Sequence, residues 1–264
     1  MTSDEGRPRD GILKLQRLSK SFGGLKAVMD FSMSLEEGEI KGLIGPNGAG
    51  KSTVFNLVSG LYRADAGRVV FNGEDITNRS PDQIVKRGIA RTFQIVKVLE
   101  DTSVLETMKT AFFLVSGYNA MDALLQTKRY RRQEKSLEEQ AITYLELLGV
   151  DHLRHQKVNE LPYGLQRKVS IARSLTLSPK ILLLDEPMGG LNHAEKEELM
   201  EIILRLQEKF GLSIILVEHD MKVIMDICES IVVMNQGAVI AEGNSKEIRN
   251  NLQVIEAYLG TSNK

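Results

Sequence analysis

Apolar and polar residues follow each other in short patterned stretches along this chain, and the stretches predict an α/β protein. Residues 11–17 alternate apolar and polar positions, which is typical of a half-buried strand. Further strand candidates follow at 40–44, 68–72, 181–184, 213–217 and 231–234. Helical segments between several of them favour a largely parallel sheet, and we expect an antiparallel portion near the N-terminus. Near the C-terminus, the run 231–234 and residues 238–241 flank a turn at 235–237, which predicts a hairpin.

Residues 193–210 carry the clearest helical pattern. Apolar residues recur there at intervals of three and four, so they share one face of a helix: Leu199, Ile202, Ile203 and Leu206. Asn192 and Glu195 occupy the two positions of a capping box at the start of the helix, and Gly211 can end it.

Residues 95–160 differ from the rest because they hold few strand signals. Their apolar positions also recur at helical spacing: Leu137, Ala141, Tyr144, Leu145 and Leu148. The pattern predicts a mostly helical insert in the α/β core. The insert contains a basic cluster at 128–132, KRYRR. Two interpretations of this cluster stay open: a solvated helix face, or a contact with anionic lipid headgroups.

The composition of the chain is that of a globular protein. Of 264 residues, 42% are hydrophobic and 26% charged, and the net charge is −1. This balance argues against a nucleic-acid partner, because nucleic-acid-binding domains are usually basic. The single cysteine, Cys228, lies in an apolar stretch and predicts a buried structural thiol. Residues 1–10 are polar, which predicts a disordered tail rather than a signal peptide, so we expect a soluble intracellular protein that reaches a membrane through a partner.

Residues 45–53 read GPNGAGKST and fit the phosphate-binding loop G-x-x-x-x-G-K-[ST]. Glycines allow the backbone to fold closely around a phosphate chain, and the N–H groups of the loop and of the following helix point at the anion. Lys51 would reach the β and γ phosphates, and the Ser52 hydroxyl would bind Mg²⁺. The alternative is a glycine-rich turn with an accidental lysine. The candidate nucleotide-binding residues of the loop are Gly45, Pro46, Asn47, Gly48, Ala49, Gly50, Lys51, Ser52 and Thr53.

Two acids, Asp185 and Glu186, follow the apolar strand 181–184. A buried strand would bring Asp185 to the edge of the sheet beside the phosphate loop, where it can hold Mg²⁺ directly or through water. Glu186 can polarise the attacking water. Taken alone, such a pair could also be an ordinary loop start; together with a phosphate loop it predicts a nucleotide hydrolase.

In the order of these motifs the chain resembles the ATP-binding subunits of ABC transporters over nearly its whole length. Phe22 in SKSFGG matches the aromatic residue that stacks on adenine in that family, with core packing as the alternative. Gln94 in ARTFQ matches the glutamine that links the nucleotide and Mg²⁺ to the helical insert. His219 matches the switch histidine that senses the γ-phosphate, and residues 189–192 match the loop that crosses the dimer interface.

Residues 161–166, LPYGLQ, match the signature loop of that family, which usually reads LSGGQ, with departures. Pro162 replaces the usual serine and has neither a hydroxyl nor an N–H, and Leu165 replaces the usual glutamine. In one interpretation Gly164 and the N-terminus of the following helix suffice for the nucleotide, and Pro162 only pre-sets the turn. In the other, the chain forms a weakened composite site and depends on a sister ATPase with a complete signature.

A more particular resemblance is to the ATPases of importers for branched-chain and other hydrophobic amino acids. It rests on GIARTFQ, QRKVSIARSL, EPMGGLN, VEHDMKVIM, VMNQG, AYLG and the long helical insert. The resemblance implies a P-loop NTPase core with a mostly parallel sheet, an N-terminal antiparallel β portion and a helical insert. The implied bounds are a disordered tail at 1–10, the core at 11–93 and 161–243, a signature-bearing helical subdomain at 94–160 and a C-terminal helical tail at 244–264.

The implied activity is hydrolysis of ATP with Mg²⁺ to power transport. The catalytic candidates are Lys51, Glu186 and His219; the metal candidates are Ser52, Gln94 and Asp185; Phe22, Gln94 and Gly164 would contact the nucleotide beside the phosphate loop. The implied partners are permease subunits, a second ATPase that is a copy or a paralogue, and indirectly a solute-binding protein, at the cytoplasmic face of the membrane. Two alternatives remain: the ATPase of another transport system, for urea import or for lipid or lipopolysaccharide export, and a non-transport nucleotide-sensing protein of the same family.

Overall fold

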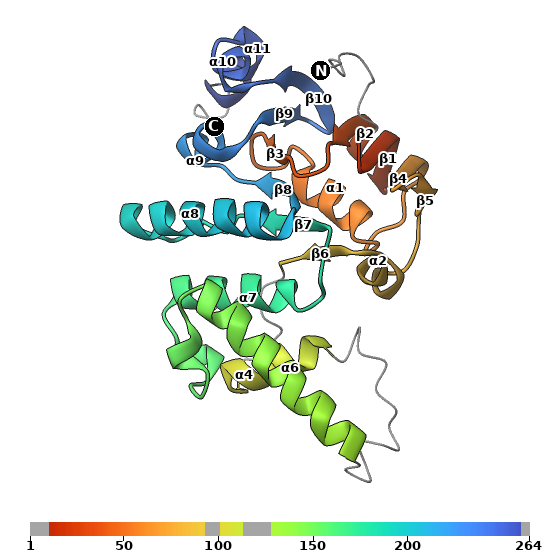
Figure 1. Cartoon of the computed structure of the whole chain (residues 1–264). Helices are drawn as coiled ribbons and strands as arrows, with labels where there is room; N and C mark the ends of the chain where they lie inside the picture. Colours follow the sequence, from red (N-terminus) through yellow and green to blue (C-terminus); the bar gives the residue numbers. More distant parts are fainter. Residues whose placement is uncertain (1–10, 93–100, 113–127, 260–264) are drawn as a thin grey trace, which may run out of the picture. The chain divides into compact units, whose positions relative to one another are not determined.

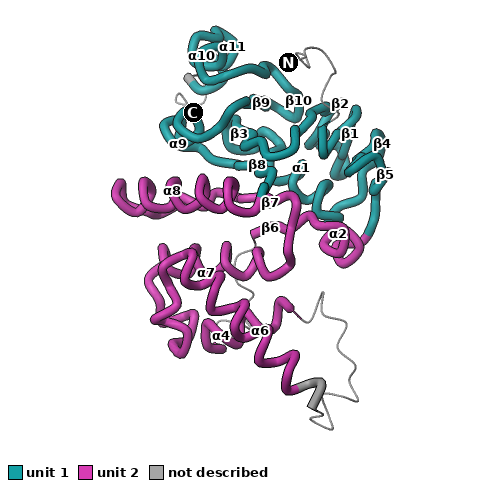
Figure 2. The backbone as a smooth tube through the Cα atoms, viewed as in Figure 1, with its two compact units in different colours: residues 1–79, 211–264 teal, residues 80–210 magenta. Residues whose placement is uncertain are grey.

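The structure is a computed structural model that describes residues 11–92, 101–112 and 128–259 (Figure 1). It divides into two compact units, one made of residues 1–79 and 211–264 and the other of residues 80–210 (Figure 2). Gln94 and the predicted tail at 1–10 lie outside the described residues. In the part of the chain that is described, no helix is both long and apolar enough to cross a membrane.

The first unit contains the predicted antiparallel portion as a four-stranded sheet in the order β2-β1-β4-β5. The fully buried side chains of these strands are large and apolar. They include Leu13, Leu15, Leu18, Phe31 and Leu35. The strands are β1 (Leu13–Phe22), β2 (Leu25–Leu35), β4 (Ala66–Phe71) and β5 (Glu74–Asp75).

The first unit also holds four strands in the order β10-β9-β3-β8. The central strand β3 runs parallel to both neighbours, while β10 returns antiparallel to β9 as the predicted hairpin. All residues of β3 and β8 are buried, as is typical of parallel strands in the middle of a sheet. The elements are β3 (Ile40–Ile44), β8 (Ser213–Val217), β9 (Ser230–Asn235), β10 (Ala238–Gly243), α1 (Lys51–Val58), α9 (Met221–Ile227), α10 (Ser245–Arg249) and α11 (Leu252–Leu259).

The second unit combines a parallel strand pair with helices. β6 (Ile89–Arg91) lies parallel to β7 (Ile181–Asp185). The helices are α2 (Pro81–Arg87), α4 (Val104–Phe112), α6 (Lys128–Leu147), α7 (Tyr163–Leu175) and α8 (His193–Phe210), with short 3₁₀ turns at Asp151–Leu153 and Val158–Glu160. The capping box of α8 is present: Asn192 N–H donates to Glu195 Oε2 at 2.9 Å, and Glu195 N–H donates to Asn192 Oδ1 at 3.0 Å.

The predicted helical insert appears as α4 and α6 in the residues that are described. Ala141, Leu145 and Leu148 are fully buried, as their helical spacing predicts. Of the basic cluster, Arg131 and Arg132 are exposed at the start of α6. Exposure fits both interpretations of the cluster.

Candidate functional site

The phosphate loop joins β3 to α1 in the first unit, as the sequence predicts. Gly45 (φ 151°) and Gly50 (φ 106°) adopt backbone conformations that L side chains rarely adopt. A Cβ atom on Gly45 would lie 2.1 Å from the carbonyl oxygen of Met234, and one on Gly50 would lie 2.4 Å from that of Ala27. Both positions therefore need glycine, because a side chain would collide with neighbouring backbone.

The turn between β9 and β10 holds the phosphate loop in place. Gly237 N–H donates to Ala49 O at 3.0 Å, and Met29 N–H donates to Gly237 O at 2.8 Å. Gly237 has a positive φ of 84°, and a Cβ atom there would lie 3.1 Å from Ala27 O, so the turn favours glycine. The two backbone groups of this one residue connect the loop to β2.

Lys51 and Ser52 are the first two residues of α1, and only the first of them is buried. Lys51 is 7% exposed, and its ammonium group donates to Gly45 O at 2.6 Å and Pro46 O at 3.0 Å, so the positive charge lies inside the curve of the loop. Ser52 is exposed in the first turn of the helix. No acidic side chain occupies this first turn and the N-cap is Gly50, so the backbone N–H groups of the helix start are directed at solvent or at an anion.

His219 follows β8 in the same unit. Leu43 on β3 pairs in parallel with Val217, the last residue of β8, so the carboxyl end of β8 lies beside the strand that enters the phosphate loop. The His219 side chain is 62% exposed, and its Nδ1 lies 3.8 Å from Oε2 of the fully buried Glu218. An exposed imidazole at the carboxyl ends of parallel strands can contact a ligand bound there.

Phe22, the last residue of β1, is 42% exposed. This exposure does not fit core packing, the alternative for this residue. Its ring centroid lies 5.1 Å from that of Tyr62 with 70° between the ring planes, and Lys20 Nζ lies 5.5 Å from its centroid. The ring is thus held by neighbours and still open to solvent.

The acid pair lies at the end of β7 in the second unit. Arg91 Nη2 on β6 donates to Asp185 Oδ2 at 2.7 Å, with the two side chains only 10% and 25% exposed. Thr92 N–H donates to Leu183 O at 3.0 Å, which extends the β6–β7 pairing beyond Arg91. Glu186 is exposed and has a positive φ of 46°, an uncommon conformation for a residue with a side chain. The Asp185 carboxylate is therefore oriented by a guanidinium, whereas Glu186 projects into solvent.

The signature-like loop begins α7 in the second unit. Pro162 is the N-cap, and its carbonyl accepts from Leu165 N–H at 3.0 Å and Gln166 N–H at 3.1 Å. Gly164 packs tightly, since a Cβ atom there would lie 3.1 Å from Leu191 Cδ2. This geometry agrees with the interpretation in which Pro162 pre-sets the turn at the start of the helix.

Tyr163 belongs to the same loop and is 47% exposed. The Arg167 guanidinium lies over its ring, 4.7 Å from the centroid, and also donates to its hydroxyl. A Cβ atom on Gly190 would come within 3.4 Å of the ring, so residues 189–192 and the start of α7 pack against each other.

Comparison with known proteins decides the family. The sequence model of the ABC transporter family matches residues 28–189, and that of the branched-chain amino acid ATP-binding cassette transporters matches residues 238–262. The chain belongs to the ATP-binding proteins of ABC transporters, in the branched-chain amino acid subgroup.

Two curated relatives of the family span nearly the whole chain. The high-affinity branched-chain amino acid transport ATP-binding protein BraF of Pseudomonas aeruginosa is 39% identical over 249 residues, which cover 94% of this chain and 98% of BraF. The corresponding protein LivG of Salmonella typhimurium is 41% identical over the same length, with the same shares of the two chains covered.

Two solved structures share the fold. The ADP conformation of MJ1267, an ATP-binding cassette of an ABC transporter, has a TM-score of 0.83 and 34% identity, covering 94% of this chain and 98% of that one. The dimeric structure of MJ0796, a bacterial ABC transporter cassette, has a TM-score of 0.75 and 25% identity, covering 88% and 98%.

The candidate residues of this family member fall into two sets, each described within its own unit. Phe22, the phosphate loop and His219 lie in the first unit. Asp185, Glu186 and Gly164 lie in the second. The structure adds two residues to which the sequence assigned no role, Arg91 beside Asp185 and Tyr62 beside Phe22. Arg91 stood in the GIARTFQ motif, but its partner is 94 residues away, so only the fold reveals the pairing.

The metal candidates fit Mg²⁺ as part of a nucleotide complex. Among the described residues, no group of three or more His, Cys, Asp and Glu side chains gathers to form a complete protein site. Mg²⁺ does not need one, because it usually takes one or two protein oxygens and completes its shell with water and phosphate oxygens. The Ser52 hydroxyl and the Asp185 carboxylate are donors of that kind, while Gln94 lies outside the described residues.

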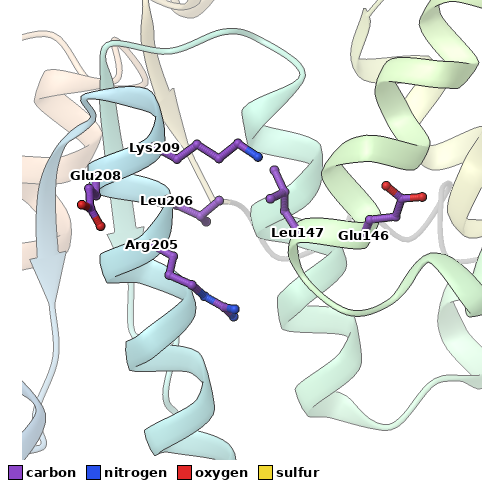
Figure 3. Close-up of a pocket in the computed structure, with 6 residues that line it drawn as sticks. All are labelled: Glu146, Leu147, Arg205, Leu206, Glu208 and Lys209. Carbon is purple, nitrogen blue, oxygen red and sulfur yellow. The ribbon is translucent and has the colours of Figure 1, made fainter.

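A separate hollow of about 540 Å³ lies in the second unit between the end of α6 and the end of α8 (Figure 3). Its lining consists of Glu146, Leu147, Arg205, Leu206, Glu208 and Lys209. None of the candidate residues lines it, and it contains no glycine-rich backbone that could approach a phosphate. The nucleotide site of the chain is therefore not this hollow.

Proposed function

We propose that this chain binds and hydrolyses ATP with Mg²⁺ to power an ABC importer for branched-chain or other hydrophobic amino acids. The phosphate loop is the main observation that supports ATP binding. Neighbouring backbone requires its glycines, and the Lys51 ammonium group lies inside the loop. The solute class is supported by the match of residues 238–262 to the branched-chain subgroup and by the names of the relatives LivG and BraF.

Each candidate residue has one role in this proposal. Lys51 and the N-terminus of α1 hold the β and γ phosphates, and Phe22 stacks on the base. Ser52 and Asp185 hold Mg²⁺, with Gln94, and the ion neutralises charge on the phosphates. Glu186 orients the attacking water, and His219 contacts the γ-phosphate. Catalysis then consists mainly of positioning and charge stabilisation.

The proposed assembly is a pair of ATPase subunits on a pair of permeases. The chain carries one phosphate loop and one signature-like loop, so two subunits are needed to supply a complete site if each nucleotide meets the loop of one subunit and the signature of the other. The dimeric cassette MJ0796, with 25% identity, supports such pairing. The second ATPase is a copy or a paralogue, the permeases hold the pair at the cytoplasmic face of the membrane, and a solute-binding protein acts on the far side.

Two measurements test the proposal. Mass spectrometry of proteins that co-purify with the chain from native membranes in mild detergent should find permeases and an ATPase. ATP hydrolysis by that complex should disappear with Lys51→Ala and persist with Lys180→Ala, a substitution at a lysine outside the site. Ribosomal or DNA-associated partners without a permease would refute the transport role, and hydrolysis that survives Lys51→Ala would refute the assigned site.

A further inference from the structure

Four large apolar side chains are exposed close together in the fold of the first unit, around the β1–β2 turn and the loop that leaves α1. Their exposed fractions are 42% for Phe22, 68% for Leu25, 47% for Leu61 and 39% for Tyr62. Clustered exposed apolar residues usually mark a binding surface. Phe22 and Tyr62 are the two aromatic residues of this patch, and their rings contact each other.

The patch lies near the phosphate loop. Phe22 pairs with Leu25 at the β1–β2 turn, and Ala27 lies two residues further along β2. The carbonyl oxygen of Ala27 is the atom that a Cβ on Gly50 would meet at 2.4 Å. Two strand residues span about 7 Å, so the strand end that bears Phe22 lies close to the part of β2 that contacts the phosphate loop.

Tyr62 links this ring to the helix that starts at the phosphate loop. α1 begins with Lys51, and beyond its last turn the Tyr62 N–H donates to Asn56 O at 3.0 Å. The Tyr62 ring then lies near-perpendicular to Phe22, an arrangement that aromatic pairs prefer. The helix α1 thus begins with the phosphate-binding Lys51, and Tyr62, which contacts the Phe22 ring, lies in the loop that follows it.

Asp65 fixes the strand end that bears Phe22. Its carboxylate accepts from Lys20 Nζ and from Ser21 N–H, both at 2.7 Å, and its own N–H donates to Ser19 O at 2.9 Å. The two bonds to the carboxylate lower the pKa of Asp65, with the Lys20 hydrogen bond as the largest cause. Held in this way, Lys20 also places its ammonium 5.5 Å from the Phe22 centroid, within cation–π range.

We propose that Tyr62 and Asp65, in the loop after α1, position the Phe22 ring as the binding platform for the nucleotide base. They are positioning residues: they act through Phe22 and leave the phosphates to the loop. A ring already fixed in its binding orientation loses less side-chain entropy when the base arrives, so the base binds more tightly. This inference rests on the proposed function, in which Phe22 stacks on the base.

The test compares a ligand that has a base with one that lacks it. Binding of ATP and of inorganic tripolyphosphate, each with Mg²⁺, is measured by calorimetry on the full chain. Tyr62→Leu should weaken ATP binding about three- to tenfold, the range for losing one aromatic pair, and change tripolyphosphate binding less than about twofold. Tyr62→Phe should restore ATP binding to within about twofold of the unmodified protein, since the ring remains.

Two further variants complete the set. Asp65→Asn keeps the side-chain shape but loses the charge that holds Lys20, and it should weaken ATP selectively in the same direction, which keeps the idea testable if Tyr62→Leu does not fold. Leu204→Ala is the matched control, an apolar residue of α8 that is 41% exposed and lies outside the patch, and it should change the binding of neither ligand. In the full complex, Tyr62→Leu should raise KM for ATP and leave kcat unchanged.

Three results would overturn the inference: unchanged ATP binding in Tyr62→Leu and Asp65→Asn, equal weakening of both ligands, or a Phe22→Ala variant that binds ATP normally. The last would leave the ATPase proposal intact as long as Lys51→Ala abolishes binding of both ligands. If the unmodified chain binds neither ligand, the proposed function itself fails, and the two failures are thereby told apart.

Discussion

The tight fit of the phosphate loop against β2 predicts a specific loss of stability in Gly50→Ala. A Cβ atom there would meet Ala27 O at 2.4 Å, in a backbone conformation of φ 106°. Ala27 lies between Lys26 and Val28, which both pair with β1, so moving this carbonyl group would disturb the pairing of its two neighbours. Gly48→Ala is the matched control, because Gly48 also has a positive φ, 79°, but its Cβ would meet nothing within 4 Å.

The expected magnitudes follow from these two descriptions. Both variants carry the cost of a side chain in a left-handed conformation, about 1–2 kcal/mol. Only Gly50→Ala adds a collision with backbone, and overpacking of this kind costs about 1–3 kcal/mol. We therefore expect losses of about 2–5 kcal/mol for Gly50→Ala and about 1–2 kcal/mol for Gly48→Ala. Urea unfolding of the nucleotide-free chain, followed by circular dichroism, measures both; a difference between the variants below about 0.5 kcal/mol would refute the reasoning.

Three other predictions concern catalysis and pH. Glu186→Gln should bind ATP, stall hydrolysis and accumulate a closed dimer in size-exclusion chromatography; normal turnover would show that Glu186 is misassigned. Pro162→Ser should raise kcat roughly 10- to 150-fold if the composite site lacks one hydrogen bond to phosphate, and a change within about twofold would favour the interpretation in which Pro162 only sets the turn. Burial, then the charges of Glu39 and Glu229, raise the pKa of the Cys228 thiol to about 12, above its ordinary value of 9.0. The contribution of this thiol to the free energy of unfolding is thus complete below pH 9.0 and is lost as the pH rises toward about 12, by about 1.4 kcal/mol per pH unit at most. In Cys228→Ala, the free energy of unfolding in urea should therefore fall less steeply with pH over that range. The same pH dependence in both proteins would contradict the burial argument.

Two buried strands and the amphipathic helix α8 were predicted most accurately from this sequence. β3 and β8 have the predicted bounds, and α8 begins and ends where its apolar face, capping box and Gly211 predict. These elements are set by local patterns, namely burial on both faces for the strands and a single buried stripe for the helix. The predicted family and fold class are confirmed as well, because the family's motifs are local in sequence.

The antiparallel sheet was harder to predict, because irregular pairing breaks the alternation of strand residues. The strand predicted at 11–17 continues to Phe22, beyond Arg17, whose positive φ of 51° interrupts the pattern. β2 was not predicted; its pairing with β1 shifts register several times, and Asp30 has a positive φ of 50°. Such bulges place successive residues on unexpected faces, so a period of two does not show in the sequence.

The contacts around the candidate site escaped prediction for a different reason. Arg91 pairs with Asp185, and Tyr62 meets Phe22, across long separations in the chain. Each residue is unremarkable in its own segment, since an arginine after a short strand or a tyrosine in a loop has many ordinary roles. Their roles depend on tertiary neighbours that no local pattern encodes. The placement of Gln94, which lies outside the described residues, stays a prediction from the resemblance.

The β9–β10 turn has a consequence for how the chain can be shortened. Gly237 bonds through its N–H to Ala49 in the phosphate loop and through its carbonyl to Met29 on β2. A truncation upstream of this turn would remove a backbone support of the loop, although it would delete no residue expected to touch ATP. A protease that cut within 235–237 would have the same effect. A fragment that keeps these two bonds must therefore include Gly237, and β10, which completes the hairpin, already lies in the segment that matches the branched-chain subgroup.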